Sequence, residues 1–299
     1  MNVLSAPQYT YTCLALVVSK GLKAIKTVVV TGASSGIGYD VALEFASKGY
    51  KVIAGARRLS TMEDLKKHGI RTVELDVTSS ESVANLKALI QTEYNGAIKY
   101  LYNNAGQPCM VAAVEVSDDQ VSKCFEVNVF GQIRVTRELA PFVIKTKGTI
   151  GFTGSIQGIR GSVFLGIYAS SKAALHSYAA ILATELAPFG VKVVNFITGG
   201  VKTGISAELD TVLYDEKGLG EIKDAFTKLG DTGMDSKVYA KKIVKDFESS
   251  KIGSDVSYRG AGASFIRIAD IFPSFVLKGL YSSMFKVKTL YREISNKYN

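Results

Sequence analysis

Three side chains in the middle of the chain have the types and the spacing of a carbonyl-reducing site. Tyr168 and Lys172 are four residues apart in an alanine-rich stretch, so a helix would place them one turn apart on the same face. Ser155 precedes Tyr168 by thirteen residues and follows an expected strand. The phenol could supply a proton while the serine hydroxyl donates a hydrogen bond to the carbonyl oxygen. Tyrosine and lysine at helical spacing also occur for structural reasons, so other features must decide.

A nearby cation would make this phenol a better acid. Tyrosine has a reference pKa of about 10 and donates a proton poorly at neutral pH. A charge ~4 Å away in a medium of effective dielectric constant about 20 contributes about 4 kcal/mol, or roughly three pKa units. We therefore expect Lys172 to lower the pKa of Tyr168 toward the pH at which acid–base catalysis is most efficient.

A glycine-rich turn near the start of the chain is the second chemical feature. Residues 31–38 read Thr-Gly-Ala-Ser-Ser-Gly-Ile-Gly and join a β-branched run at 27–30 to a helical pattern at 39–48. Such a turn directs backbone N–H groups and a helix N-terminus at one point, which suits a phosphate, and glycine lets the ligand approach closely. A tight turn without a ligand is the alternative. The residues expected to hold a dinucleotide here are Gly32, Ser34, Ser35, Gly36, Ile37 and Gly38.

The residues after the next strands favour NADP over NAD. NAD sites usually carry an acidic residue about 20 positions after the glycines, whereas this chain has Arg57 and Arg58 there. Two guanidinium groups can bind a 2′-phosphate. Asp76, beside Val77, can accept a hydrogen bond from the adenine amino group. The fourth strand ends in small and amide side chains that suit a cofactor, at Asn104, Ala105 and Gly106. Ordinary loop capping is the alternative for Asp76 and for the asparagine.

Strand-like and helical patterns alternate along most of the chain, which predicts an α/β fold with a doubly wound parallel sheet, the Rossmann fold. The expected strands are 27–31, 51–56, 71–75, 100–103, 149–153 and 192–197. Capping boxes at Ser60, Thr78 and Ser117 predict helix starts, and Gly49, Gly69 and Gly96 predict helix ends. Residues 203–229 read as an irregular insertion. Residues 235–249 read as an amphipathic helix, whose apolar side is expected to contain Val238, Ile243, Val244 and Phe247.

Two outer segments flank a single expected domain at 27–262. Residues 1–26 form an N-terminal extension whose apolar run is short. Residues 263–299 form an amphipathic, apolar and basic helical tail without an uncharged stretch long enough to cross a bilayer. Its aromatic and basic residues suit a membrane interface, although covering the core is the alternative. The alanine-rich helix at 173–187 could pack against its own copy in a homodimer.

Composition limits the partners of the protein. The net charge is +9, which favours anionic cofactors, substrates or membrane surfaces. No nucleic-acid motif is present. The three cysteines lack metal-type spacing and predict free thiols in a reducing compartment, and the two histidines are too few for a histidine-based metal site.

Taken together, these motifs resemble the short-chain dehydrogenase/reductase family. The resemblance covers about residues 27–203 and includes the glycine turn, Asp76, residues 103–106 and the Tyr168-x-x-x-Lys172 pair. It implies a catalytic set of Asn128, Ser155, Tyr168 and Lys172. In that set Asn128 would hold a water of the proton relay, and Lys172 would also contact the nicotinamide ribose. Val201 and Thr203 would contact the carboxamide. The family usually has Pro-Gly where this chain has Gly199-Gly200, so we expect a more flexible turn there.

Several stretches are similar to one subgroup of that family, the fungal NADPH-dependent reductases of 1-acyl-dihydroxyacetone phosphate. These stretches are residues 102–107, 127–131, 197–201 and 258–260. The similarity implies reduction of a lipid ketone to 1-acylglycerol 3-phosphate (lysophosphatidic acid), with NADPH as cofactor. It also implies peripheral association with the cytosolic face of the endoplasmic reticulum and of lipid droplets.

Three other interpretations stay open. The same chemistry could act on another lipid ketone or aldehyde, such as a retinal or a steroid. Gly32-x-Ser34-x-Gly36 also fits the nucleophile elbow of serine esterases, for which His68 or His176 would have to serve as the base. A non-catalytic cofactor-binding protein is the third, and the complete catalytic set argues against it.

Overall fold

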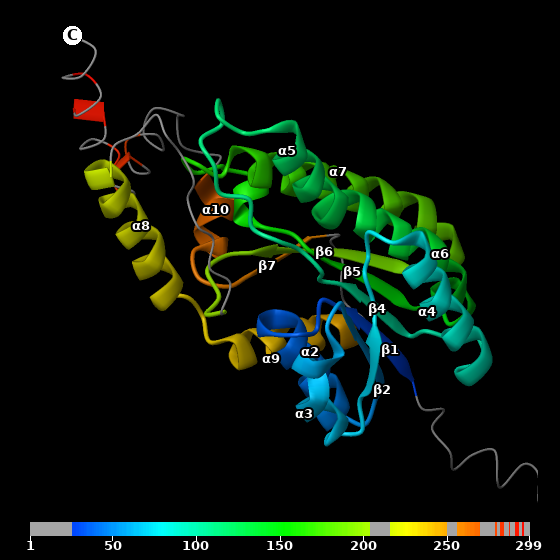
Figure 1. The fold of residues 1–299 in the computed structure, drawn as a ribbon. Helices are drawn as coiled ribbons and strands as arrows, with labels where there is room; N and C mark the ends of the chain where they lie inside the picture. Colours follow the sequence, from blue (N-terminus) through cyan, green and yellow to red (C-terminus); the bar gives the residue numbers. More distant parts are fainter. Residues whose placement is uncertain are drawn as a thin grey trace, which may run out of the picture.

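A seven-stranded parallel sheet forms the centre of the molecule (Figure 1). The computed structural model describes residues 26–203, 216–249 and 256–269, and the single positions 279, 282, 283, 287, 291, 292 and 295. The strands lie in the order β3-β2-β1-β4-β5-β6-β7, and every neighbouring pair is parallel. The order reverses between β1 and β4, which creates the crevice at which open α/β sheets bind ligands. Their bounds are β1 Thr27–Thr31, β2 Lys51–Ala56, β3 Arg71–Glu74, β4 Tyr100–Asn103, β5 Thr149–Thr153, β6 Lys192–Thr198 and β7 Val256–Arg259.

Helices cover both faces of the sheet, so the central strands are buried on both sides and need continuous apolar runs. On one face, α2 (Gly36–Ser47) and α9 (Ser236–Glu248) enclose an apolar cluster built around Phe45 and Phe247. On the other face lies a second cluster, built around Leu101 and Phe152. It is covered by α4 (Ser80–Glu93), α6 (Gly131–Lys145) and α7 (Gly166–Leu186). The shorter or outer helices are α3 Glu63–Lys66, α5 Asp118–Phe125, α8 Glu216–Asp231 and α10 Ala263–Ala269.

The predicted doubly wound sheet is confirmed, and so are the six expected strands. Four of them have the expected bounds, β3 ends one residue earlier, and β6 extends one residue further. The seventh strand, β7, was not expected. It pairs with β6 from Asn195↔Val256 to Thr198↔Arg259, and the Arg259 guanidinium fastens it to α9 through two hydrogen bonds to Asp246 (2.7 and 2.8 Å).

Local signals predicted some helix boundaries correctly. Ser117 forms the expected capping box with Gln120 at the start of α5. Gly49, Gly69 and Gly96 all have positive φ angles (79°, 72° and 56°) just after α2, α3 and α4, which is the conformation that favours glycine at a helix end.

The predictions of capping boxes at Thr78 and Ser60 are wrong. Helix α4 starts one residue later than expected, with Ser79 as its N-cap, because the N–H and the hydroxyl of Thr78 donate to Asp76 instead. Ser60 lies inside a single 3₁₀ turn, Leu59–Met62, that precedes α3.

Two expectations for the later part of the chain need correction. The segment at 203–229 is not irregular throughout, because α8 begins at Glu216; residues 204–215 lie outside the described residues. On α9, Val238 is 46% exposed, and the helix buries Tyr239 and Ala240 together with Ile243, Val244 and Phe247.

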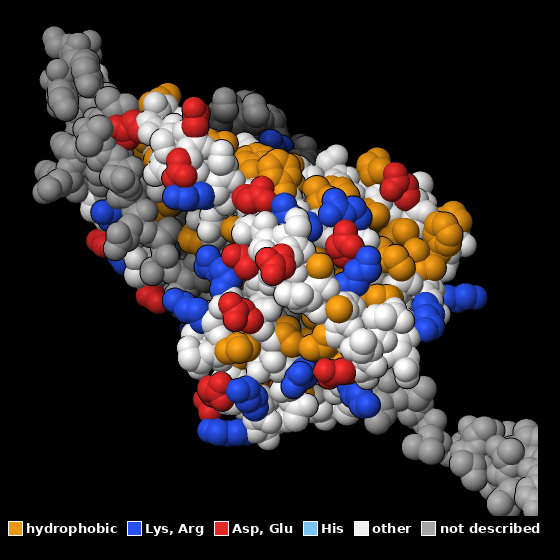
Figure 2. All heavy atoms as spheres, turned by 45° about the vertical axis from the view of Figure 1, so that its right-hand side comes forward, with side chains coloured by type: hydrophobic (Ala, Val, Ile, Leu, Met, Phe, Trp, Pro, Cys, Tyr) orange, Lys and Arg blue, Asp and Glu red, His pale blue; other side chains and the backbone are white. Residues whose placement is uncertain are grey.

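The proposed outer segments fall mostly outside the described residues. That applies to residues 1–25 and, apart from single positions, to the tail after α10. Helix α10 itself buries Ala263 and Ile266 against the domain. Among the described helices, none combines the length and the apolar character that a bilayer crossing requires. Figure 2 shows charged side chains of both signs interspersed on one face, with hydrophobic side chains gathered toward α6 and α7. Helix α7 exposes Ala173, Ala180 and Ile181, and packing against a second copy stays a prediction.

The double glycine after β6 is held tightly, contrary to the flexible turn that we expected. The Gly199 N–H donates to the Arg259 carbonyl (2.8 Å), and Gly200 exchanges two hydrogen bonds with Ala261 (2.9 and 3.0 Å). A Cβ atom at Gly199 would lie 2.0 Å from the Ala261 carbonyl oxygen. The loop after β7 therefore requires a residue at position 199 that has no side chain and that keeps its N–H, and proline meets neither condition.

We predict that Gly199→Ala destabilises the protein by about 2–3 kcal/mol, because backbone atoms must move to admit the methyl group. Thermal and urea unfolding would measure the change. Gly220→Ala is the matched control, since a Cβ there meets nothing within 4 Å and alanine is the better helix former by about 1 kcal/mol. A Gly199→Ala protein as stable as the parent would contradict this account.

Candidate active site

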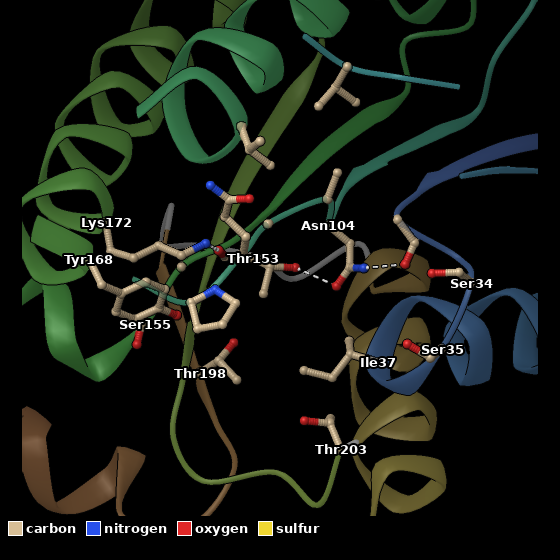
Figure 3. A pocket seen from close by; sticks show the side chains of 18 of the residues that line it. Ser34, Ser35, Ile37, Asn104, Thr153, Ser155, Tyr168, Lys172, Thr198 and Thr203 are labelled. Carbon is tan, nitrogen blue, oxygen red and sulfur yellow. Dashed lines mark hydrogen bonds between the residues drawn. The ribbon is translucent and has the colours of Figure 1, made fainter. Parts of the chain in front are cut away.

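A cavity of about 440 Å³ opens at the carboxyl edge of the sheet (Figure 3). It lies at the reversal of strand order, at the ends of the paired strands β1 and β4. The structure brings fifteen of the predicted site residues together in its wall: Gly32, Ser34, Ser35, Ile37, Arg57, Asp76, Val77, Asn104, Ala105, Gly106, Ser155, Tyr168, Lys172, Val201 and Thr203. Gly36, Gly38, Arg58 and Asn128 are not part of the wall.

The glycine turn leaves no room for side chains on its inner side. Gly32 has a φ of +67°, and a Cβ there would lie 2.7 Å from Ala105 Cα. A Cβ at Gly38 would lie 2.4 Å from the Gly32 carbonyl oxygen. At the start of α2, the N-cap Ser35 makes no side-chain capping hydrogen bond within the described chain. The turn is thus a close-fitting backbone cradle at a helix N-terminus, which fits the pyrophosphate of a dinucleotide.

Asn104 connects the glycine turn to the neighbouring strands. Its Nδ2 donates to the carbonyls of Thr31 and Gly32 (both 3.1 Å), and its Oδ1 accepts from the Thr153 hydroxyl (3.0 Å; Figure 3). The Thr31 hydroxyl in turn accepts the backbone N–H groups of Asn104 and Ala105 (both 3.0 Å). Asn104 therefore fixes the shape of the cavity floor as well as lining it.

The two arginines after β2 occupy different positions. Arg57 is exposed and lines the cavity, whereas Arg58 precedes the 3₁₀ turn outside it. Within the described part of the chain, neither guanidinium has an ion-pair partner. Asp76 lines the cavity too, although its Oδ1 already accepts two hydrogen bonds from Thr78 (2.9 and 2.7 Å). Arg57 is thus the better placed of the two arginines for a 2′-phosphate.

Asn128 lies behind the wall of the cavity, in a π-helical turn (Glu126–Phe130) between α5 and α6. Its side chain is fully buried and holds the loop after β4. Oδ1 accepts the Gln107 N–H (2.8 Å), and Nδ2 donates to the Gln107 carbonyl (3.0 Å) and to Ser171 Oγ (3.1 Å). A relay water held at Asn128 stays a prediction.

The three side chains expected to act on a carbonyl, Ser155, Tyr168 and Lys172, line the cavity near the N-terminal end of α7. The hydroxyls of Ser155 and Tyr168 point toward the same place in the cavity (Figure 3). Lys172 Nζ lies 5.8 Å from the centre of the Tyr168 ring and donates to the Thr153 carbonyl (2.8 Å). A proton donor, a second hydroxyl and a cation thus surround one volume beside the cradle.

The expected effect of Lys172 on the acidity of Tyr168 is wrong. Burial raises the pKa of Tyr168, while its hydrogen bond with Ser155 acts in the opposite direction. Burial also lowers the pKa of Lys172 to about 8. The ammonium points to the Thr153 carbonyl, and desolvation of the phenolate dominates. The phenol is therefore protonated at neutral pH, which is the form that a proton donor needs.

His176, one turn after Lys172 on α7, contacts Ser155 from outside the cavity wall. Its Nε2 accepts the backbone N–H of Ser155 (3.1 Å). Burial, and secondarily the charge of Lys172, lower the pKa of His176 to about 4. The sequence suggested this histidine only as a base for Ser34, but neither His176 nor the exposed His68 lines the cavity that contains Ser34. The esterase interpretation thus lacks a base at the serine.

The low pKa of His176 predicts a specific acid sensitivity. Between pH 6.5 and about 4, the unfolded chain binds a proton that the folded protein excludes, so the free energy of unfolding should fall by up to about 3 kcal/mol as the pH drops through this window. Urea unfolding from pH 7.5 to 4 would measure the loss. His176→Gln should lack this part of the pH dependence; identical slopes in both proteins would refute the assignment.

Comparison with known proteins agrees with this geometry. Residues 26–212 match the short chain dehydrogenase family. The chain is 41% identical over 286 residues to an NADPH-dependent 1-acyldihydroxyacetone phosphate reductase of Saccharomyces cerevisiae, covering 91% of this chain and 95% of that protein. A protein of the same name from Schizosaccharomyces pombe is 40% identical over 188 residues, covering 62% of this chain and 64% of its own length.

A solved structure shows the same architecture. The crystal structure of a short-chain dehydrogenase from Streptomyces avermitilis superposes with a TM-score of 0.74 at 26% identity, covering 90% of this chain and 98% of the other. Sequence match, fold and site arrangement lead to one conclusion: the chain belongs to the short-chain dehydrogenase/reductase family.

Proposed function

We propose that this protein is an NADPH-dependent oxidoreductase that reduces 1-acyl-dihydroxyacetone phosphate to 1-acylglycerol 3-phosphate. The observation that carries the proposal is the meeting of Ser155, Tyr168 and Lys172 in the same cavity as the glycine cradle. The name and the extent of the S. cerevisiae relative support both the cofactor and the substrate. The net charge of +9 suits a phosphorylated cofactor and substrate.

Each side chain has a role in the proposed reaction. Bound NADPH supplies the hydride to the carbonyl carbon. Tyr168, protonated because burial raises its pKa, gives its proton to the carbonyl oxygen, so that a secondary alcohol results. Ser155 hydrogen-bonds to the same oxygen and orients it. Lys172 would contact the nicotinamide ribose, and Val201 and Thr203, which line the same cavity, would contact the carboxamide. Asn128 would hold a water of the proton relay, as the family resemblance implies. Its own hydrogen bond to Ser171, whose hydroxyl donates to the Tyr168 backbone carbonyl (2.7 Å), helps to position the first turn of α7.

We predict that Tyr168→Phe lowers kcat by about 10²- to 10⁴-fold, because the general acid is lost. NADPH oxidation with 1-acyl-dihydroxyacetone phosphate measures kcat, and NADPH fluorescence measures cofactor binding, which should be unchanged. Full activity in this variant would rule the mechanism out.

The substrate is tested by removing its phosphate. Acyl-dihydroxyacetone without phosphate should give a kcat/KM at least about tenfold lower, since a charge-assisted contact contributes about 1.5–3 kcal/mol. Equal or better turnover of the unphosphorylated ketone, of a retinal or of a steroid ketone would favour another lipid carbonyl as the substrate.

Arg57 is the residue that we expect to recognise the 2′-phosphate. Arg57→Ala should lower kcat/KM for NADPH by roughly 10- to 100-fold, because a charge-assisted hydrogen bond is lost, and should leave the low activity with NADH unchanged. Arg58→Ala is the matched control, and its effect should be smaller because Arg58 does not line the cavity. A larger effect of Arg58→Ala would reverse the assignment.

We also propose that the enzyme works as a peripheral protein at the cytosolic face of the endoplasmic reticulum and of lipid droplets. A substrate with an acyl chain resides in such surfaces, and α10 exposes Phe265 (43%) and Ile268 (52%) beside Arg267. Apolar and basic side chains together suit an anionic interface. Co-sedimentation with phosphatidylserine vesicles should decrease in the double variant Phe265→Ser, Ile268→Ser; unchanged binding would exclude α10 as the contact.

A further inference from the structure

We propose that His176 is a positioning residue for Ser155, an inference that rests on the proposed reductase function. The neutral imidazole fixes the backbone of the serine, so that its hydroxyl stays directed at the carbonyl oxygen beside Tyr168. His176 itself lies outside the cavity wall and touches no substrate atom.

The contact between the two residues is direct. The Ser155 N–H donates to His176 Nε2 across 3.1 Å. Position 155 has an extended backbone (φ −151°, ψ 147°) between the end of β5 and a single 3₁₀ turn, Ile156–Gly158. Its N–H therefore has no regular ladder or helix partner, and a buried N–H without a partner is costly. The imidazole of His176 supplies the hydrogen-bond acceptor that the neighbouring backbone does not.

The chain around the imidazole is shaped to receive it. A Cβ at Gly154 would lie 2.8 Å from His176 Nε2, and a Cβ at Gly158 would lie 2.6 Å from His176 Cε1. Glycines on both sides of Ser155 thus let the ring approach the backbone, and any larger residue at either position would displace it. The low pKa of the ring, about 4, keeps Nε2 available as an acceptor at neutral pH.

The contact with His176 helps to fix the orientation of the Ser155 hydroxyl. Ser155 Oγ accepts the Gln157 N–H (3.2 Å), so one lone pair of the oxygen is held while the hydroxyl hydrogen is left for the substrate. With its amide held by His176 and its oxygen held by Gln157, the side chain is fixed from two sides. Without the imidazole, the backbone N–H of Ser155 would lose its acceptor and the serine could shift. A shift of about 1 Å at a reacting group can cost about 10²-fold in rate.

Two substitutions separate positioning from simple packing. His176→Leu keeps the volume but removes the acceptor, and we expect kcat to fall roughly 10- to 100-fold with unchanged NADPH binding. His176→Gln places an amide oxygen near the position of Nε2, and we expect kcat within about threefold of the parent. His68→Leu, on the other and exposed histidine, is the matched control and should leave kcat unchanged. Full-length proteins are compared in kcat, KM, NADPH fluorescence and melting temperature.

Each outcome decides the proposal. Loss in His176→Leu with recovery in His176→Gln supports it, as does a His176→Leu effect that vanishes in a Ser155→Ala background. Parental kcat in His176→Leu, or equal losses in both variants, overturns it. Should His176→Leu not fold, His176→Asn replaces it, because its shorter amide cannot reach the N–H; parental kcat there overturns the proposal.

The failure of this inference can be told from that of the proposed function. If the parent protein reduces the ketone and Tyr168→Phe does not, then a parental kcat in His176→Leu refutes only the positioning role of His176. If the parent protein reduces no lipid ketone, the proposed function fails. In that case a scalar coupling between Ser155 N and His176 Nε2 in a ¹⁵N-labelled sample still tests the contact, and its absence would overturn it.

Discussion

A single residue, Thr153 at the end of β5, joins the two halves of the site. Its carbonyl accepts the Lys172 ammonium from α7 (2.8 Å), and its hydroxyl donates to Asn104 (3.0 Å), which in turn holds the carbonyls of Thr31 and Gly32. The chain of hydrogen bonds runs from the helix that bears Tyr168, the proposed proton donor, to the turn that we propose for the dinucleotide. A hydride and a proton must reach one carbonyl group, so these two parts have to keep a fixed separation, and the strand end provides it.

Burial sets the chemistry of this site more strongly than charge does. Lys172 is 3% exposed and Ser155 is 6% exposed, and desolvation is the largest cause of the shifted pKa values of Tyr168, Lys172 and His176. Desolvation disfavours every charged form, so the phenol keeps its proton and the imidazole stays neutral. A neutral donor and a neutral acceptor on either side of the serine suit a reductase that works near neutral pH.

Close backbone approach is the second constraint, and it explains where glycine is needed. A Cβ at Gly38 would lie 2.4 Å from the Gly32 carbonyl oxygen of the same turn, and a Cβ at Gly199 would lie 2.0 Å from the Ala261 carbonyl oxygen of the loop after β7. The first contact closes the dinucleotide cradle, and the second seals the loop after β7 against the turn that follows β6. The turn at Gly199-Gly200, where the family usually has Pro-Gly, is thus held in place by its backbone hydrogen bonds to Arg259 and Ala261.

The sequence by itself determined the parallel sheet, most strand bounds and fifteen residues of the cavity wall. Buried parallel strands require apolar runs, and residues that follow them meet at one edge whatever the details of packing. Only the tertiary structure decided the direction of the Tyr168 pKa shift, the separate positions of Arg57 and Arg58, the strand β7 and the contact between His176 and Ser155. Those features depend on distances and on exclusion of water between segments far apart in the chain. Spacing along the sequence shows which side chains share a helical face, but it does not show what desolvates them or which backbone groups they meet.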